Sequence, residues 1–198
     1  MNVHELKKQQ WDKFYETKSY ISNTSVNLIL NYHNLSWPKK LVIMDIGVGQ
    51  GDFIKSLSKD NIMIGVDVSQ KALDTVKPFC KNVYFSKDLK EIEDVDLAIC
   101  NLVMQHNHEY EVARIINDVN IKKDGILSFQ FASLNEEKST LTPKTIKNLN
   151  NGMYYFYSPK KMASIVDSTN KKVLKIFGPY WFGNDHNFDW NIFHVVKK

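Results

Sequence analysis

Three glycines at alternate positions, preceded by an aspartate, follow an apolar run in LVIMDIGVGQGDF, residues 41–53. Without side chains, these positions let the backbone adopt tight or positive-φ geometry and bring its N–H groups against a ligand. A dinucleotide-binding fingerprint would place a glycine or alanine where this chain has Asp52. Asp45 suits a ligand with an ammonium group better than a pyrophosphate, which it would repel. The alternative is a turn that packs a helix closely on a strand and holds no ligand. The glycines concerned are Gly47, Gly49 and Gly51.

Carboxylates also follow the next two apolar runs. IMIGVDVS ends in Asp67, a position from which a carboxylate can accept hydrogen bonds from both hydroxyls of a ribose. The alternative for Asp67 is a helix cap, together with Ser69. In FSKDL, Asp88 offers a carboxylate to the exocyclic amine of an adenine and Leu89 offers an apolar side chain to its ring face, although Asp88 could equally cap a helical turn. The three stretches together predict an adenosine that carries a charged tail.

Short apolar runs alternate with helical segments along the chain, and the residues above stand at the ends of the first three runs. Near-continuous apolar strands that alternate with helices indicate a mostly parallel sheet covered on both faces, which is the doubly wound α/β class. In such a sheet the ligand binds beyond the carboxyl ends of the strands. The predicted strands are Leu41–Ile46, Ile62–Val66, Asn82–Phe85, Val95–Cys100 and Gly125–Phe131. The predicted helices are Asp52–Lys59, Gln70–Lys77, Glu109–Asn120 and a segment near 159–167.

Three segments fall outside this alternation. Residues 1–37 predict one or two helices that pack before the first strand as a lid. Residues 134–157 are long for a loop in a compact domain and predict an insertion on the substrate side. The runs KKVLKIFG and DWNIFHVVKK, separated by the turn GPYWFGNDHN, predict a hairpin that brings the strands to seven. Because no crossover helix joins its two strands, one of them must run antiparallel to the rest.

Length and composition limit the classes of protein. A chain of 198 residues predicts a single domain, residues 1–198. No stretch approaches the roughly 18 apolar residues that a membrane span needs, and MNVHELKKQQ lacks the apolar core of a secretory signal, so the expected location is cytoplasmic. Cys80 and Cys100 lack the spacing of a zinc site, and no metal is expected. Arg114 is the only arginine, which disfavours a nucleic-acid substrate because arginine is the usual residue for gripping phosphates and guanine edges.

The motif series resembles that of the class I S-adenosylmethionine-dependent methyltransferases, of the type that acts on small molecules. It comprises DIGVGQG after the first strand, GVD at the second, SKDL after the third and DLAICNLVMQH at the fourth, within residues 40–133. The resemblance implies a Rossmann-like seven-stranded sheet whose last strand is antiparallel. It also implies S-adenosylmethionine as the cofactor and S-adenosylhomocysteine as the product.

Carried over by position, the resemblance implies a set of cofactor-binding residues. Asp45, Gly47 and Gly49 would line the methionine moiety, with Val48 and Gly51 in the same turn; Asp67 and Val68 would meet the ribose, Asp88 and Leu89 the adenine, and Asn101 and Leu102 would form the floor near the sulfonium, while Trp11 and Tyr15 would cover the cofactor. Val48 departs from the cysteine or alanine of many members. Since valine adds bulk but no charge, the departure leaves the expected cofactor unchanged.

Methyl transfer from a sulfonium is an in-line displacement, so the protein must place the nucleophile, exclude water and, for a hydroxyl, remove a proton. His106, in NLVMQHNHEY, is the expected base because the loop after the fourth strand borders the methyl in this fold and an imidazole titrates near neutrality. The alternative is a loop histidine beside a helix cap. His108, in the first turn of the helix, and His186, in the terminal hairpin, are the other candidates.

No motif identifies the acceptor. NLVM after the fourth strand is not the proline-proline-aromatic tetrad common in amino-group base methylases, and no Pro-Cys pair is present. The expected reaction is methyl transfer to a small molecule, foremost at a hydroxyl and otherwise at an amine. One alternative is a methyltransferase of RNA or protein, which predicts a continuous basic surface. Another is a binding module that keeps the fold without catalysis. The sequence does not predict an oligomeric state.

Overall fold

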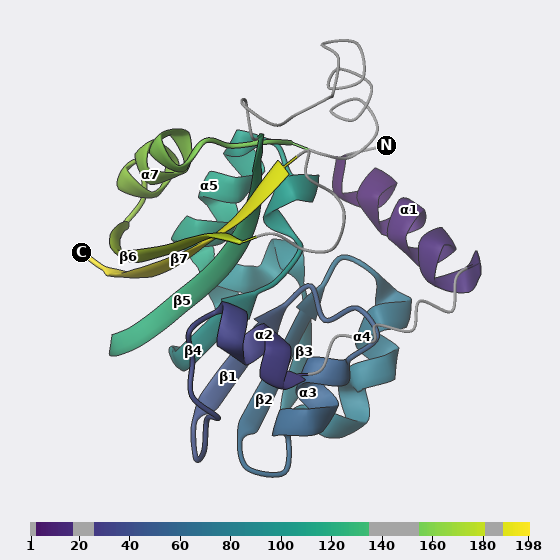
Figure 1. Cartoon of the computed structure of the whole chain (residues 1–198). Coiled ribbons are helices and arrows are strands. Elements are labelled where there is room, and N and C mark those ends of the chain that lie inside the picture. Colours follow the sequence, from purple (N-terminus) through teal and green to yellow (C-terminus); the bar gives the residue numbers. More distant parts are fainter. Residues whose placement is uncertain (1–2, 18–25, 135–154, 181–187) are drawn as a thin grey trace.

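A mixed sheet forms the centre of the protein (Figure 1), seen in a computed structural model that describes residues 3–17, 26–134, 155–180 and 188–198. Within these residues the sheet has seven strands in the order β3-β2-β1-β4-β5-β7-β6. The first five pair in parallel, and β7 is antiparallel to both of its neighbours. The predicted fold class is therefore confirmed. The strands are β1 (Val42–Ile46), β2 (Ile62–Asp67), β3 (Asn82–Phe85), β4 (Val95–Cys100), β5 (Ile121–Leu134), β6 (Lys171–Tyr180) and β7 (Phe188–Lys197).

Helices pack on both faces of the sheet because the parallel strands are apolar on both sides. One buried cluster joins α5 and α7 to β1, β4, β5 and β7, and a second joins α2, α3 and α4 to the opposite face. The described helices are α1 (Val3–Thr17), α2 (Val26–Tyr32), α3 (Asp52–Leu57), α4 (Gln70–Val76), α5 (Glu109–Asp118) and α7 (Pro159–Asp167). Short 3₁₀ helices lie at η1 (Lys77–Phe79), η2 (Ser86–Glu91) and η3 (Met104–His106). No helix in the described part of the chain is long and apolar enough to cross a membrane.

The fifth strand is longer than the sequence predicts at both ends. Its pairing with β4 shifts between Val95 and Leu97, so β5 continues through a bulge. Gly125 lies at this bulge, where an added Cβ would lie 2.9 Å from the carbonyl oxygen of Val95. The sequence therefore presents a glycine and a charged run, KKDG, inside what is one continuous strand.

The described part of the segment before the first strand contains two helices, where the sequence predicts one or two. α2 packs into the core through Val26, Ile29 and Leu30. α1 stands away from the sheet and approaches α4 (Figure 1). Most of the predicted 134–157 insertion, and the tip of the terminal hairpin with His186, lie outside the described residues.

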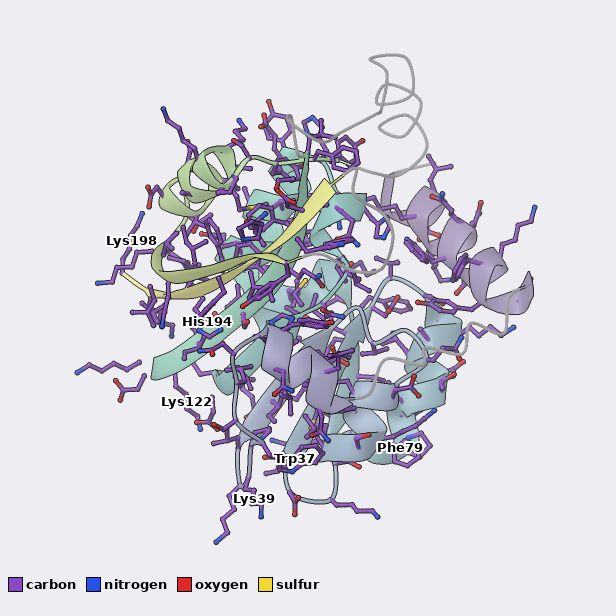
Figure 2. All side chains as sticks on the ribbon, in the orientation of Figure 1. Trp37, Lys39, Phe79, Lys122, His194 and Lys198 are labelled. Carbon is purple, nitrogen blue, oxygen red and sulfur yellow. The ribbon has the colours of Figure 1, made fainter. Side chains whose placement is uncertain are left out.

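The two ends of the parallel strands differ in what surrounds them. The exposed side chains of Trp37, Lys39 and Phe79 lie around the amino-terminal ends of β1 and β3 (Figure 2). The glycine turn, the two buried aspartates and α1 lie at the carboxyl ends. Because ligands of open α/β sheets bind at the carboxyl ends, the site is to be sought there.

Candidate cofactor-binding and active site

A cavity of about 780 Å³ opens at the carboxyl ends of β1, β2 and β4. This volume falls within the roughly 300–1,000 Å³ of typical ligand sites. The cavity is lined by the turn after β1, by residues of α1, η3 and α5, and by Ile29 from α2 and Trp190 from β7. The structure brings together in this cavity eleven of the residues that the sequence singles out: Trp11, Asp45, Gly47, Val48, Gly49, Gly51, Asp67, Val68, Asn101, Leu102 and His106.

The three glycines of the turn serve different purposes. All have positive φ, at 85° for Gly47, 53° for Gly49 and 78° for Gly51. An added Cβ on Gly47 would lie 2.2 Å from a methyl group of Val103, and one on Gly51 would lie 2.4 Å from a methyl group of Val76. On Gly49 the nearest atom would be the Tyr15 hydroxyl, at 3.4 Å. Close packing therefore requires Gly47 and Gly51, whereas Gly49 is open toward α1 and the cavity.

Two buried carboxyl groups face the cavity. Asp45 is 5% and Asp67 6% exposed. Burial raises the pKa of Asp45 to about 7, and the charge of Asp67 adds to this effect. Burial likewise raises the pKa of Asp67 to about 6, although the amides of Ser69 (2.9 Å) and Gly49 (3.3 Å) donate hydrogen bonds to it. Among the described residues no lysine or arginine pairs with either carboxylate. A cationic ligand would supply the missing positive charge.

Helix α1 lines the cavity and is tied to the body of the protein by two contacts from its middle part. Asp12 accepts hydrogen bonds from the Ser69 hydroxyl (2.5 Å) and from the Lys71 amide (3.5 Å), both at the start of α4. Earlier in the helix, the amine of Lys7 donates to the side-chain oxygen of Asn107. Trp11 lines the cavity, and so do two aromatic neighbours in edge or tilted contact with it, Phe14 and Tyr15.

Of the three candidate histidines, His106 is the one that the described residues place in the cavity wall. Its ring centroid is 5.2 Å from that of Trp11, in an edge contact, and its Nε2 lies 3.3 Å from the side-chain nitrogen of Gln105. His108 is exposed and lies between Tyr110 and Tyr155 instead of at the cavity. His106 therefore lines the cavity, whereas His108 does not.

Asn101 belongs to a buried polar network that the sequence did not predict. His33 has no exposed surface; its Nδ1 lies 2.6 Å from the Ser128 hydroxyl and its Nε2 3.2 Å from the Asn101 side-chain oxygen. Burial lowers the pKa of His33 to about 4, so the ring is neutral. The amide oxygen accepts only, hence Nε2–H donates to Asn101 and Nδ1 accepts from the serine. No local pattern signals this network, because its members lie far apart in the sequence: His33 follows α2, Asn101 follows β4 and Ser128 lies in β5.

The two residues that the resemblance implies for the adenine do not line the cavity. The side chain of Leu89 is completely buried in the core, and Asp88 lies on η2 away from the cavity wall. Their assignment to the base stays a prediction. Ser86, two residues earlier, does line the cavity, and its hydroxyl is buried with no hydrogen-bond partner among the described residues. The side-chain oxygen of Gln105 is likewise buried without a hydrogen-bond partner among the described residues.

Arg114 contacts two residues that line the cavity, Ser86 and Glu111. Its guanidinium donates to both oxygens of Glu111, to Asp118 and to the carbonyl oxygen of Ser86. The single arginine therefore connects α5 to η2. In the described part of the chain, no three histidine, cysteine or carboxylate side chains come together as metal ligands.

Known proteins resemble this chain in fold and not in sequence. No family model matches it, and neither does any curated protein. Among solved structures, magnesium protoporphyrin IX methyltransferase (ChlM) from Synechocystis PCC 6803, with bound SAH, is 16% identical over 100% of both chains, with a TM-score of 0.67. Mitomycin 7-O-methyltransferase MmcR is 14% identical over 99% of this chain and 60% of its own, with a TM-score of 0.68. A pericyclic reaction enzyme is 9% identical over 100% of this chain and 55% of its own, with a TM-score of 0.65.

These similarities establish the fold, which is the fold of the class I methyltransferases. The chain spans only 55–60% of the length of the last two proteins but the full length of ChlM. A methyltransferase and an enzyme of pericyclic chemistry share this fold, so the activity of the present chain has to be argued from its own site.

Proposed function

We propose that this protein transfers a methyl group from S-adenosylmethionine to a small-molecule acceptor, at a hydroxyl or an amine. The observation that carries the proposal is the pair of buried carboxyl groups, Asp45 and Asp67, beside a positive-φ glycine turn in a cofactor-sized cavity. An ammonium group offsets the cost of ionising a buried carboxylate, and ribose hydroxyls can donate to another. S-adenosylmethionine carries both groups: the hydroxyls belong to its ribose, and the ammonium belongs to the methionine tail attached to that ribose through the sulfonium.

The residues present fit this cofactor by the chemistry of their donor set. Asp45, at the end of β1, is assigned to the ammonium of the methionine tail, and Gly49 lets the backbone approach it. Asp67, at the end of the neighbouring strand β2, is assigned to the ribose with Val68 beside it. Asn101 and Leu102, at the end of β4, line the same cavity on the other side of β1 and are assigned to the region of the sulfonium.

Bound S-adenosylmethionine supplies an activated methyl group, so the protein has to position the acceptor, exclude water from the cavity and provide a proton acceptor. α1 lines the cavity and is assigned the exclusion of water, and Asp12 and Lys7 hold it to the body of the protein. His106 lies in the wall next to Trp11 and is assigned the role of base toward an acceptor hydroxyl or ammonium. A base of this kind contributes typically 10²- to 10⁴-fold to a rate.

Calorimetric titration with S-adenosylmethionine and S-adenosylhomocysteine tests the binding half of the proposal. We expect micromolar-range affinity for both. Gly49→Leu should abolish binding, because its side chain would enter the space between the turn and Tyr15, and Asp67→Ala should weaken it at least tenfold by removing the ribose acceptor. Asp124→Asn, an exposed substitution on β5, is the matched control. Wild-type affinity in both site variants would refute the assignment of the cavity.

A screen with methyl-labelled S-adenosylmethionine tests the transfer half. Label should enter small molecules of a cell extract, and His106→Ala should lose turnover by 10²-fold or more while cofactor affinity stays within about threefold. Label in RNA or protein would favour the macromolecular alternative. Binding of the cofactor without transfer to any fraction would favour a non-catalytic module.

A further inference from the structure

We propose that the hydroxyl of Ser86, in place of the carboxylate of Asp88, hydrogen-bonds to the purine base of the cofactor. The inference rests on the proposed function and deepens it by assigning the base end of the same cavity. Ser86 is 7% exposed, lines the cavity and has a hydroxyl without a hydrogen-bond partner among the described residues. Because a buried hydroxyl that lacks a partner costs free energy, a ligand group that completes its hydrogen bonding gains affinity.

The sheet order places Ser86 where the base would lie. β1, β2 and β3 are neighbours, and Asp67 at the end of β2 pairs with Phe85 at the end of β3. Ser86 follows Phe85 directly. A nucleoside whose ribose binds at Asp67 and whose tail lies toward β1 therefore extends its base toward β3 and Ser86. Val68 and Ile115 line the cavity as well and offer apolar surface to a ring.

Arg114 acts as a positioning residue for Ser86. Its Nη2 donates to the Ser86 carbonyl oxygen (3.0 Å), which fixes the main chain at the start of η2. The same guanidinium holds both oxygens of Glu111, at 2.7 and 2.9 Å. Glu111 also lines the cavity, and this pairing sets its negative charge against a positive one. The base end of the cavity thus presents a neutral hydroxyl beside a carboxylate, that of Glu111, which is paired with Arg114.

A hydroxyl and a carboxylate recognise a purine base through different hydrogen bonds. An ionised carboxylate only accepts, so it favours the 6-amino group of adenine and repels a 6-oxo group. A serine hydroxyl rotates, and it can accept from an amino group or donate to an oxo group. A site read by Ser86 should therefore discriminate weakly between adenine and hypoxanthine.

Titration of S-adenosylhomocysteine into the protein and three variants tests the assignment. Ser86→Ala should lower affinity about 3- to 10-fold, the effect of one neutral hydrogen bond to ligand. Asp88→Ala and Ser168→Ala should stay within twofold; Ser168 is an exposed serine whose hydroxyl bonds to Ile165 at the end of α7. The thermal midpoint of ligand-free Ser86→Ala should equal or exceed that of the wild type, because the change removes an unpartnered polar group. Loss of stability and affinity together would indicate a structural role and overturn the inference.

Two further outcomes would also overturn it. One is unchanged affinity in Ser86→Ala, and the other is a loss of tenfold or more in Asp88→Ala. The affinity of the wild type for S-inosylhomocysteine should be within about tenfold of its affinity for S-adenosylhomocysteine. A difference above 100-fold would contradict recognition of the base by a hydroxyl. Failure of the wild type to bind S-adenosylhomocysteine at all is a separate result, which would refute the proposed function itself.

Discussion

Asp45 and Asp67 stand at the ends of adjacent parallel strands, both almost fully buried, and the charge of Asp67 adds to the effect of burial in raising the pKa of Asp45. The pair is a cost to the folded protein at neutral pH. It becomes favourable once a cation and hydroxyl donors fill the cavity. Stability without ligand and affinity for ligand should therefore respond to these residues in opposite directions.

The first prediction concerns stability against pH. The pKa of Asp45 rises from 3.8 to about 7 and that of Asp67 to about 6, so the folded chain keeps protons that the unfolded chain has released. Their stabilising contribution is complete below about pH 4 and is lost as pH rises through about 6 and 7. Asp45→Asn should remove the share of this loss that is due to Asp45, about 4 kcal/mol for a pKa shift of this size, and should stabilise the ligand-free protein at pH 8. Urea unfolding at pH 5 and pH 8, on the wild type and the variant, measures this loss of unfolding free energy.

The control for this experiment is Asp124→Asn, since that carboxyl is exposed. Its unfolding free energy should follow the wild type at both pH values. If Asp45→Asn were less stable than the wild type at pH 8, Asp45 could not be a buried carboxyl that lacks a cationic partner in the ligand-free protein.

The second prediction couples binding to protons. If the ammonium of S-adenosylmethionine binds beside Asp45, it favours the ionised carboxylate and lowers its pKa, so the complex should release up to one proton at pH 6.5. Affinity should accordingly rise about 3- to 10-fold between pH 6 and pH 8. Calorimetry in two buffers of different ionisation enthalpy gives the proton count directly. In Asp45→Asn the dependence of the binding enthalpy on the buffer should fall to the smaller part that comes from Asp67; a buffer-independent wild type would place the ammonium elsewhere.

The third prediction separates the glycines. Gly51→Ala should lower the unfolding free energy by roughly 1–3 kcal/mol, because its Cβ would meet a Val76 methyl group at 2.4 Å and φ is 78°. Adding Val76→Ala should recover the part due to the clash but not the part due to φ. Gly49→Ala has space, at 3.4 Å from Tyr15, and should cost about 1 kcal/mol. Equal losses in Gly49→Ala and Gly51→Ala would contradict this division.

The fourth prediction concerns the attachment of α1. Asp12→Ala removes the acceptor of the Ser69 hydroxyl and the Lys71 amide, so α1 should open more often over a bound cofactor. Dissociation of S-adenosylhomocysteine, followed by stopped-flow displacement, should accelerate about 3- to 10-fold with little change in the unfolding midpoint. Glu16→Ala, an exposed change in the same helix, is the control and should leave dissociation unchanged. Identical rates in Asp12→Ala and the control would show that this contact does not hold the helix.

The sequence predicts the fold and the cofactor side of the cavity better than the rest because those features are local. Fully buried parallel strands appear in the sequence as continuous apolar runs, and a turn that requires positive φ appears as glycines. β5 was predicted too short because a bulge places Gly125 inside a strand. Ser86 was missed for another reason. A serine after a strand looks like any cap, and only the packing of α5 and the cavity around it leaves its hydroxyl without a partner.

The fifth prediction concerns His33, whose partners Asn101 and Ser128 lie far away in the sequence and which no local pattern indicates. Burial lowers its pKa from 6.5 to about 4. Between pH 4 and pH 6.5 the imidazole is therefore protonated in the unfolded chain and neutral in the folded one. The contribution of His33 to stability is present above about pH 6.5 and is lost as pH falls toward 4, opposite in sign to that of Asp45.

Nitrogen NMR should show the ring neutral at pH 5.5 with the proton on Nε2, because Asn101 presents an oxygen to that atom. His33→Phe should cost roughly 2–5 kcal/mol, since it leaves Asn101 and Ser128 without partners, and His33→Gln should recover part of this loss. An imidazole that titrates near pH 6.5, or that carries its proton on Nδ1, would contradict the network. In that case the amide of Asn101 would be free to turn, and its orientation toward the cavity would have to come from the ligand.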